Sequence, residues 1–259
     1  MRVGLFVTCL VDAMRPNIGL STVKLLEEAG CEVVYPKSQT CCGQPAYNSG
    51  DRKSSQALAK KLMTEFSDVD YIVIPSGSCA GMVKVHYEEL FDESPDLKAK
   101  AQWLAARTYE LTDFLETVLG VESFATPFRG SITYHDSCAG LRELGVKKQP
   151  RSLLQKIPDL EIVELPGAEE CCGFGGTFSV KYGDISGRIV DLKCDDVEST
   201  EADALVLGDL GCMMNIEGRL RRRGNKTTKV LHVSEVLAGM ISDDSEYIGI
   251  SHGAHITQI

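Results

Sequence analysis

The chain has 259 residues, 43% of them hydrophobic, so it can form two modest domains or one large one around a buried core. Its formal net charge of −10 and its pI near 5.1 argue against binding to the phosphate backbone of nucleic acids, which depends largely on Lys and Arg. Proteins and small molecules are therefore the expected partners.

Short apolar runs alternate with amphipathic helical patterns along the first half of the chain. An irregular loop, Pro36–Gly50, follows the second predicted strand. The predicted strands are Arg2–Thr8, Glu32–Tyr35 and Tyr71–Ile74, and the predicted helices are Ile18–Ala29, Arg52–Phe66, Met82–Phe91 and a helical stretch over Asp96–Leu119 with a break near Thr112.

After a linker at 121–130, the same alternation begins again. A long loop, Pro166–Tyr182, follows the second predicted strand of this half. The predicted strands are Ser131–Tyr134, Glu161–Leu165 and Ala204–Leu207, and the predicted helices are Arg151–Ile157, Ile185–Val197 and a helix that ends in the arginines 221–223. The last matching segment is Lys229–Met240, in which Val233–Leu237 resembles Leu111–Leu115. Each of these two short segments has a candidate helix N-cap.

Eight of the ten cysteines repeat with a nearly constant offset, which indicates a duplicated domain. The offset is 129 between Cys9 and Cys138, 130 between the Cys-Cys-Gly triplets at 41–43 and 171–173, and 133 between Cys79 and Cys212. The predicted architecture is α/β, with two duplicated Rossmann-like domains of mainly parallel sheet, related by a pseudo-two-fold axis.

The repeat also predicts the domain boundaries. We expect domains at 1–121 and 130–241. The remaining segment, 242–259, has no counterpart in the first half, so we expect it to be peripheral or poorly ordered.

The cysteines are expected to work as thiols. Leu5–Val11 is too short for the apolar part of a signal peptide, and no stretch approaches the roughly 18 apolar residues of a membrane span. We therefore expect a cytoplasmic protein, in which thiols stay reduced. In that compartment, ten cysteines indicate metal ligands or redox groups.

A vicinal cysteine pair is better explained by thiolates that converge on one centre than by a strained disulfide. Sets of four thiolates suit iron–sulfur clusters or zinc. The wide spacing favours iron–sulfur clusters over zinc knuckles, and catalytic thiols or disulfides are the remaining alternatives. The predicted ligands are Cys9, Cys41, Cys42 and Cys79 for the first set, and Cys138, Cys171, Cys172 and Cys212 for the second.

The order of a cysteine, a Cys-Cys-Gly triplet and a further cysteine, present twice, resembles the cysteine-rich CCG domain. That domain occurs in heterodisulfide reductase B subunits, anaerobic glycerol-3-phosphate dehydrogenase C subunits, glycolate oxidase iron–sulfur subunits and the lactate utilisation protein A family. The segments that carry the resemblance, over about residues 1–241, look most like the last of these. They are Val7–Cys9, Gln39–Pro45, Pro75–Cys79 and Tyr134–Cys138.

Membership of that last family implies a cytoplasmic iron–sulfur electron-transfer subunit of a complex that oxidises L-lactate to pyruvate. It also implies a ferredoxin-like partner and a third lactate-utilisation protein. No residue pattern here indicates a hydride acceptor or a general base, so we expect the chain not to be catalytic alone. The glycines at 173–176 lack the dinucleotide-binding spacing, so no tightly bound NAD or flavin is predicted.

The sequence departs from the heterodisulfide reductase pattern, whose sites end in a C-x-x-C motif. Met82 and Asn215 stand where the fifth thiols would lie. This departure argues against a noncubane cluster with disulfide-cleaving activity. It leaves four thiolates per set, which suffice for two [4Fe–4S] clusters. A heterodisulfide-type enzyme, a glycolate oxidase-type subunit and a zinc-stabilised interaction module remain the alternatives.

A few further residues have two possible readings. Cys31 and Cys194 have no counterparts in the repeat and are expected to be buried apolar residues. His135 and Asp136 could tune a nearby cluster or serve a structural role at a strand end. The basic run at 219–223 could dock an acidic partner, although cations at a helix C-terminus are common for dipole reasons alone.

Overall fold

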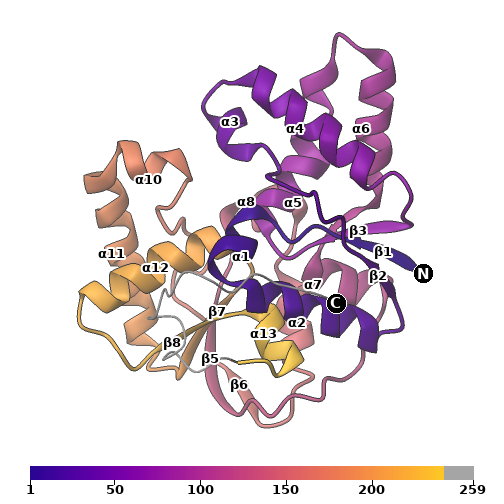
Figure 1. Ribbon diagram of the computed structural model, residues 1–259. Coiled ribbons are helices and arrows are strands. Elements are labelled where there is room, and N and C mark those ends of the chain that lie inside the picture. Colours follow the sequence, from indigo (N-terminus) through magenta and orange to yellow (C-terminus); the bar gives the residue numbers. More distant parts are fainter. Residues whose placement is uncertain (242–259) are drawn as a thin grey trace.

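The computed structural model describes residues 1–241, which form two four-stranded parallel sheets, one in each half of the chain (Figure 1). The first sheet contains β1 (Arg2–Leu5), β2 (Glu32–Val34), β3 (Tyr71–Ile74) and β4 (Thr108–Glu110) in the spatial order β2-β1-β3-β4. The second contains β5 (Gly130–His135), β6 (Leu160–Ile162), β7 (Ala204–Leu207) and β8 (Lys229–His232) in the order β6-β5-β7-β8. The second sheet therefore repeats the first strand for strand, which confirms the duplicated Rossmann-like fold.

Helices connect the strands in both halves. The first half contains α1 (Cys9–Met14), α2 (Pro16–Glu28), α3 (Gln44–Asn48), α4 (Arg52–Glu65), α5 (Gly77–Gly81), the π-helix η1 (Met82–His86), the 3₁₀-helix η2 (Glu89–Phe91), α6 (Pro95–Arg107), α7 (Leu111–Asp113) and the π-helix η3 (Phe114–Val118). The second half contains α8 (Cys138–Leu144), α9 (Lys148–Leu154), α10 (Thr177–Lys181), α11 (Gly183–Ser199), α12 (Leu210–Arg222) and α13 (Val233–Ala238).

Local sequence signals explain several of these boundaries. Pro16 occupies the first turn of α2, where its missing N–H costs no hydrogen bond, and Gly30 ends the segment with φ +80. At the start of α4, the Asp51 side chain accepts a hydrogen bond from the Ser54 amide at 3.0 Å. The central strands β3 and β7 are almost wholly buried, as is usual for parallel sheets that are covered on both faces.

The prediction of one helical stretch over Asp96–Leu119 was wrong at its centre. The helix ends at Arg107, Thr108 is extended with φ −88 and ψ 132, and Thr108–Glu110 pairs with β3 as β4. A three-residue strand is too short to show a two-residue period, and its hydrogen bonds come from a strand more than 30 residues away in the sequence. The corresponding four-residue strand β8 was also not predicted as a strand, and it pairs with β7, 25 positions earlier in the sequence.

The two predicted loops are also partly helical. Pro36–Gly50 contains α3, and Pro166–Tyr182 contains α10. Both helices have only five residues and bury none of their side chains, so the helical period of apolar residues is absent from their sequences.

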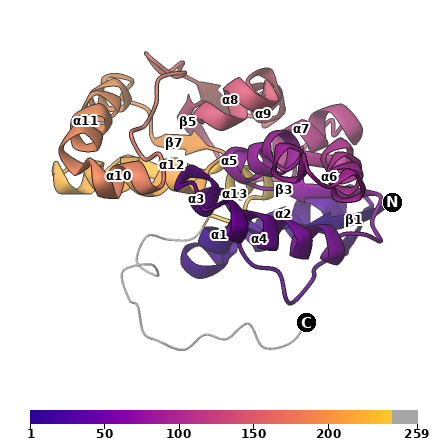
Figure 2. The same cartoon turned by 90° about the horizontal axis from the view of Figure 1, so that it is seen from above.

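The two halves exchange equivalent contacts, which supports the pseudo-two-fold relation. The last helix of the second half, α13, packs on α2 of the first (Figures 1 and 2), and α7 of the first packs on α9 of the second (Figure 2). One buried apolar cluster contains Leu25 and Phe114 from the first half together with Leu154 and Leu237 from the second. The halves therefore share a core.

Among residues 1–241, no helix is both long and apolar enough to cross a membrane. The predicted peripheral segment 242–259 lies outside the described residues. The domain boundaries at 121 and 130 stay a prediction.

Candidate functional site

The first cysteine set collects its thiols from the carboxyl ends of three strands. Cys9 begins α1 directly after β1, Cys41 and Cys42 lie in the loop between β2 and α3, and Cys79 lies in α5 after β3. The sulfurs of Cys42 and Cys79 are 3.4 Å apart. Cys41 contacts both Cys9 and Cys42, so the four sulfurs form one connected group.

The second cysteine set repeats this arrangement. Cys138 begins α8 directly after β5, Cys171 and Cys172 lie in the loop between β6 and α10, and Cys212 lies in the first turn of α12 after β7. Contacts run from Cys138 to Cys171, from Cys171 to Cys172 and from Cys172 to Cys212. The structure thus brings together in each half the four cysteines that the spacing selected, at the sheet edge where open α/β folds place their ligands.

The backbone geometry explains why each Cys-Cys pair is followed by a glycine. Gly43 and Gly173 have φ +88 and +83, a left-handed conformation that favours glycine. This conformation turns the Gly43 amide to the sulfur of Cys41 at 3.4 Å and the Gly173 amide to the sulfur of Cys171 at 3.3 Å. Each triplet therefore supplies two sulfurs and one N–H donor to the same centre.

One thiol in each set is strongly acidic because its neighbours donate to it. Contacts with Cys42 and Cys9 and the amide of Gly43 lower the pKa of Cys41 to about 2. In the second set, Cys138, Cys172 and the Gly173 amide lower the pKa of Cys171 to about 2 in the same way. Each set thus stabilises a thiolate, which is the ligand form of cysteine.

A side-chain donor fixes the second cysteine of each pair through its backbone carbonyl. Tyr87 donates its hydroxyl to the carbonyl oxygen of Cys42 at 2.8 Å, and the amide nitrogen of Asn215 donates to the carbonyl oxygen of Cys172 at 2.8 Å. Asn215 thus holds the Cys172 segment from the position at which the heterodisulfide reductase pattern has a fifth thiol. Tyr87 was not singled out from the sequence, and Asn215 was noted only as the residue at the position of the missing fifth thiol.

A carboxylate joins the two sets. Ser76 and Asp209 are the N-caps of α5 and α12, the helices that carry Cys79 and Cys212. Asp209 accepts hydrogen bonds from the Ser76 hydroxyl at 3.0 Å, the Ser78 amide at 2.9 Å and the Gly211 amide at 3.0 Å. The start of each helix is therefore tied to the other across the boundary between the halves.

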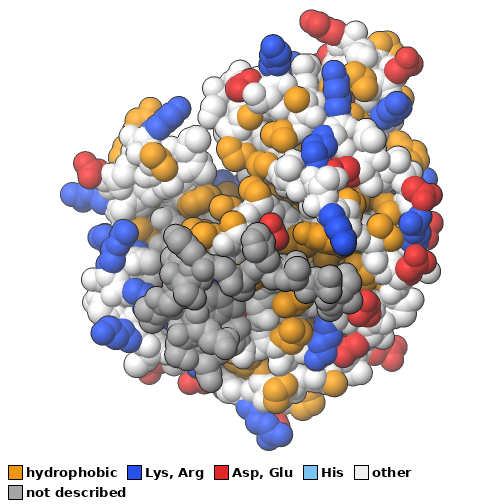
Figure 3. Space-filling model, viewed as in Figure 1, with side chains coloured by type: hydrophobic (Ala, Val, Ile, Leu, Met, Phe, Trp, Pro, Cys, Tyr) orange, Lys and Arg blue, Asp and Glu red, His pale blue; other side chains and the backbone are white. Residues whose placement is uncertain are grey.

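A pocket of about 300 Å³ opens between the halves and reaches the second set. Cys138, Cys171, Cys172 and Cys212 line one side of the pocket, and Tyr47 and His86 of the first half line the other. The His86 Nε2 lies 3.4 Å from a carboxylate oxygen of Glu143. Hydrophobic side chains also gather near the meeting line of the halves on the face in Figure 3. The pocket therefore gives solvent access to the second set.

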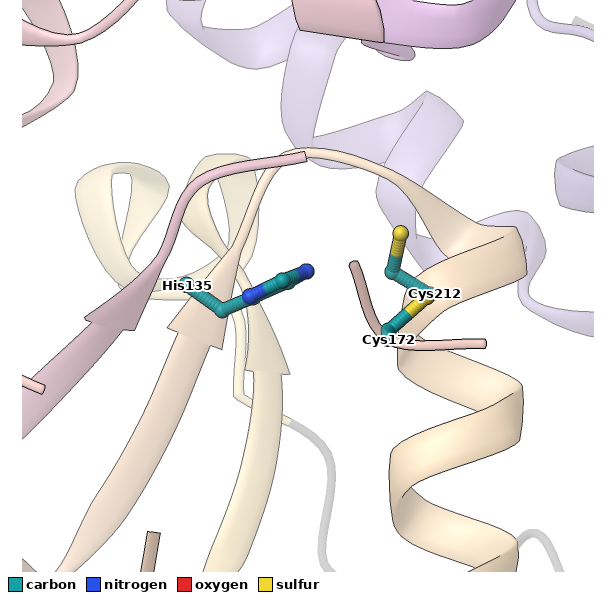
Figure 4. Close-up of side chains that lie close together, drawn as sticks. All are labelled: His135, Cys172 and Cys212. Atoms are coloured by element: carbon teal, nitrogen blue, oxygen red, sulfur yellow. The ribbon is translucent and has the colours of Figure 1, made fainter. Parts of the chain in front are cut away.

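His135 and Asp136, for which the sequence allowed either a tuning or a structural role, have different surroundings. Asp136 is buried in a bidentate ion pair with Arg151, with N–O distances of 2.8 and 3.0 Å, so its role is structural. His135 is fully buried, and neither of its ring nitrogens has a hydrogen-bond partner. Its ring projects from the end of β5 toward Cys172 and Cys212, with ligand atoms of the three residues within 4.8 Å of one another (Figure 4).

The two cysteines outside the sets are buried, and arginines of the basic run at 219–223 form ion pairs within the second half. Cys31 and Cys194 are buried among apolar residues, as predicted. Arg219 pairs with Asp191, and Arg223 pairs with Asp191, Asp195 and Glu198, all of them acidic residues of α11. These ion pairs within the chain favour a structural role for the basic run at the end of α12 over a docking patch for an acidic partner.

The donor chemistry of both sets suits a metal ion or a metal cluster. Each set offers four thiols, one of them strongly acidic, and a backbone N–H directed at sulfur. The second set adds an unpartnered imidazole and an adjoining pocket.

Known proteins are similar to this chain over most of its length. The CCG cysteine-rich domain family matches residues 3–84 and 132–217. Lactate utilization protein A of Geobacillus kaustophilus is 52% identical over 237 residues, which are 92% of this chain and 98% of that protein, and the protein of the same name from Bacillus subtilis is 50% identical over 92% of this chain and 99% of that protein. A crystal structure of a hypothetical protein from Helicobacter pylori has a TM-score of 0.59 at 14% identity, covering 95% of this chain and 50% of that one, so the likeness shows the fold alone. This chain belongs to the lactate utilization protein A family of CCG cysteine-rich domain proteins.

Proposed function

We propose that the chain is an iron–sulfur electron-transfer subunit of a cytoplasmic complex that oxidises L-lactate to pyruvate. The observation that carries the proposal is the pair of four-thiol sets at the carboxyl ends of parallel strands, each with a glycine amide directed at sulfur. The name of the similar proteins supports lactate utilisation as the process.

Each set has the donors for one [4Fe–4S] cluster, because four thiolates suffice for the four irons. The ligands would be Cys9, Cys41, Cys42 and Cys79 in the first half, and Cys138, Cys171, Cys172 and Cys212 in the second. A cluster supplies one-electron transfer, and the chain supplies its ligands, the amide donors and the surrounding charge. The pocket beside the second set supports the proposal, because a cluster needs more room than a single ion.

The lactate oxidation itself is assigned to the complex. Conversion of lactate to pyruvate removes two electrons and two protons, and clusters accept electrons one at a time. We therefore propose that a ferredoxin-like iron–sulfur subunit and a third lactate-utilisation protein complete the pathway for the electrons. The pocket that reaches the second set is a candidate meeting point with a small molecule or a partner group.

Specific observations bear on two alternatives to the iron–sulfur function, a zinc site and a heterodisulfide-type enzyme. The 3.4 Å separation of the Cys42 and Cys79 sulfurs suits one small ion, because tetrahedral Zn–S bonds of about 2.3 Å place sulfurs about 3.8 Å apart. This favours zinc as the second candidate. A heterodisulfide-type enzyme is disfavoured, because Met82 is wholly buried and Asn215 is engaged with the Cys172 backbone.

Metal analysis separates these functions. Anaerobically purified protein should contain about eight iron and about eight sulfide per chain, as two [4Fe–4S] clusters require. Cys42→Ser and Cys172→Ser should each remove about half of both, whereas Cys31→Ala, a buried cysteine outside the sets, should remove neither. Stoichiometric zinc without sulfide would contradict the iron–sulfur assignment.

The process is tested in cells. Deletion of the gene should abolish growth on L-lactate as the sole carbon source and leave growth on glucose unchanged. The wild-type gene should restore growth, and the variant Cys42→Ser/Cys172→Ser should not. Normal growth of the deletion strain on lactate, in a strain without a second copy, would refute the lactate assignment.

A further inference from the structure

The two cysteine sets have matching ligands but different surroundings. His135 lies 129 positions after Phe6, the same offset that separates Cys138 from Cys9. Both residues follow equivalent positions in the paired strands, since Leu5 pairs with Val73 and Tyr134 pairs with Val206. The first set therefore has a buried phenyl ring where the second has a buried imidazole.

The imidazole of His135 lacks the partner that its burial requires. A buried polar group without a hydrogen bond has lost its contacts with water and gained none in return, so such groups are rare in folded proteins. The carbonyl of Ala168 lies near the ring and accepts a hydrogen bond from the Asp136 amide at 3.1 Å, but neither ring nitrogen makes a hydrogen bond with it. The sulfurs of Cys172 and Cys212 are the ligand atoms that lie near the ring, and they would carry negative charge as metal ligands (Figure 4).

A buried positive charge adds to the difference. The buried positions 55, 59, 62 and 63 of α4 recur 131 positions later in α11, at 186, 190, 193 and 194. Leu62 thus corresponds to Lys193, whose side chain is 1% exposed and donates to the carbonyl of Gly167. Its ammonium lies 4.0 Å from a carboxylate oxygen of Asp196, which is 28% exposed and offsets only part of the charge, and the ammonium also acts on both Cys171 and Cys172. Asp209 lies between the halves and contacts the helix starts of both sets, so it does not cancel this difference.

We propose that the two centres have unequal reduction potentials, with the second the more easily reduced, because His135 donates a hydrogen bond to a sulfur of the group held there and Lys193 adds a buried positive charge. The proposal rests on the iron–sulfur function proposed above. Reduction adds negative charge to a cluster, and hydrogen-bond donors and cations near its sulfurs stabilise that charge. Phe6 and Leu62 offer neither to the first centre. His135 is a positioning and tuning residue, and four thiolates remain the ligands.

A redox titration of the anaerobic full-length protein, followed by electron paramagnetic resonance, tests this. The wild-type protein should show two one-electron waves. His135→Phe, which gives the second centre the residue of the first, should shift the more positive wave to lower potential and leave the other in place. Lys193→Leu should shift the same wave in the same direction. His135→Gln keeps a side-chain N–H and should shift it less than His135→Phe.

The controls distinguish a failure of the iron–sulfur assignment from a failure of the inference about unequal reduction potentials. Phe6→Leu exchanges one apolar group for another beside the first set and should move neither wave. Wild-type protein without iron and sulfide would overturn the proposed function and this inference together. Fully loaded His135→Phe with unchanged waves, or with both waves shifted equally, would overturn this inference alone. Strong nitrogen hyperfine coupling that His135→Phe removes would also overturn it, because His135 would then be an iron ligand.

Discussion

At the scale of single residues, the glycines of the two triplets are as important as the cysteines. Gly173 combines φ +83 with close packing, since a Cβ there would lie 2.9 Å from the Ser186 carbonyl oxygen and 3.1 Å from the Cβ of Ile189. A side chain at this position would be strained in its backbone and would push α11 away from the loop. The amide that contacts the Cys171 sulfur would then move.

The substitution Gly173→Ala should therefore lower stability by about 1–3 kcal/mol and reduce the iron content of the second centre. The control is Gly187→Ala, in the interior of α11, where a Cβ meets nothing within 4 Å. That change should raise stability by up to about 1 kcal/mol through helix propensity and leave the iron content unchanged. Urea unfolding and iron analysis measure both. Full iron loading in Gly173→Ala would contradict the role of this turn.

At the scale of elements, each of the short helices that follow β4 and β8 begins after a buried N-cap residue. Glu110 is the N-cap of α7, and its carboxylate accepts hydrogen bonds from the Thr112 amide at 2.7 Å, the Thr112 hydroxyl at 2.5 Å and the Asp113 amide at 3.2 Å. His232 is the N-cap of α13 and forms a capping box with Glu235. Equivalent caps let each helix leave its sheet edge and pack on the other half.

Burial raises the pKa of Glu110 to about 7, although its hydrogen bonds from Thr112 and Asp113 oppose the shift. The folded state then binds more protons than the unfolded state, whose carboxyl has a pKa near 4.5. The stability that Glu110 contributes is therefore present below pH 4.5 and is lost as pH rises to about 7.

The measurement is the difference in unfolding free energy between the wild type and Glu110→Gln at a series of pH values. The advantage of the wild type over this variant should decline by roughly 2–3 kcal/mol between pH 4.5 and 7 and level off about one pH unit above the folded-state pKa. Glu122→Gln, at an exposed position in the linker, should show a flat difference over the same range. A flat difference for Glu110→Gln as well would mean that the buried carboxyl keeps an ordinary pKa.

At the scale of the whole molecule, the two halves act as one unit. They share a buried apolar cluster, they exchange the contacts of α13 with α2 and of α7 with α9, and Asp209 joins the helices that carry Cys79 and Cys212. A disturbance at this carboxylate should therefore reach both cysteine sets.

The substitution Asp209→Asn leaves one amide or hydroxyl donor without an acceptor, because an asparagine side chain offers one oxygen in place of two. We expect a loss of about 1–3 kcal/mol and a lower iron content in both centres. The control Asp203→Asn changes an exposed carboxylate that also accepts two hydrogen bonds, both from Ser131, and should cost less than about 1 kcal/mol with normal loading. Loss of iron from only one centre would show that the halves are not coupled through Asp209.

The sequence by itself determined the duplication, the α/β class and the eight cysteines, because each rests on a repeating pattern of residue types. It did not determine β4 and β8, which pair with strands 36 and 25 positions away, or α3 and α10, which have five residues each and no buried face. Only the tertiary structure distinguished His135 from Asp136, since the partner of Asp136 is Arg151, 15 positions away, and the imidazole has none. The pocket between the halves and the bond from Ser76 to Asp209 likewise join residues that meet only when both halves are folded.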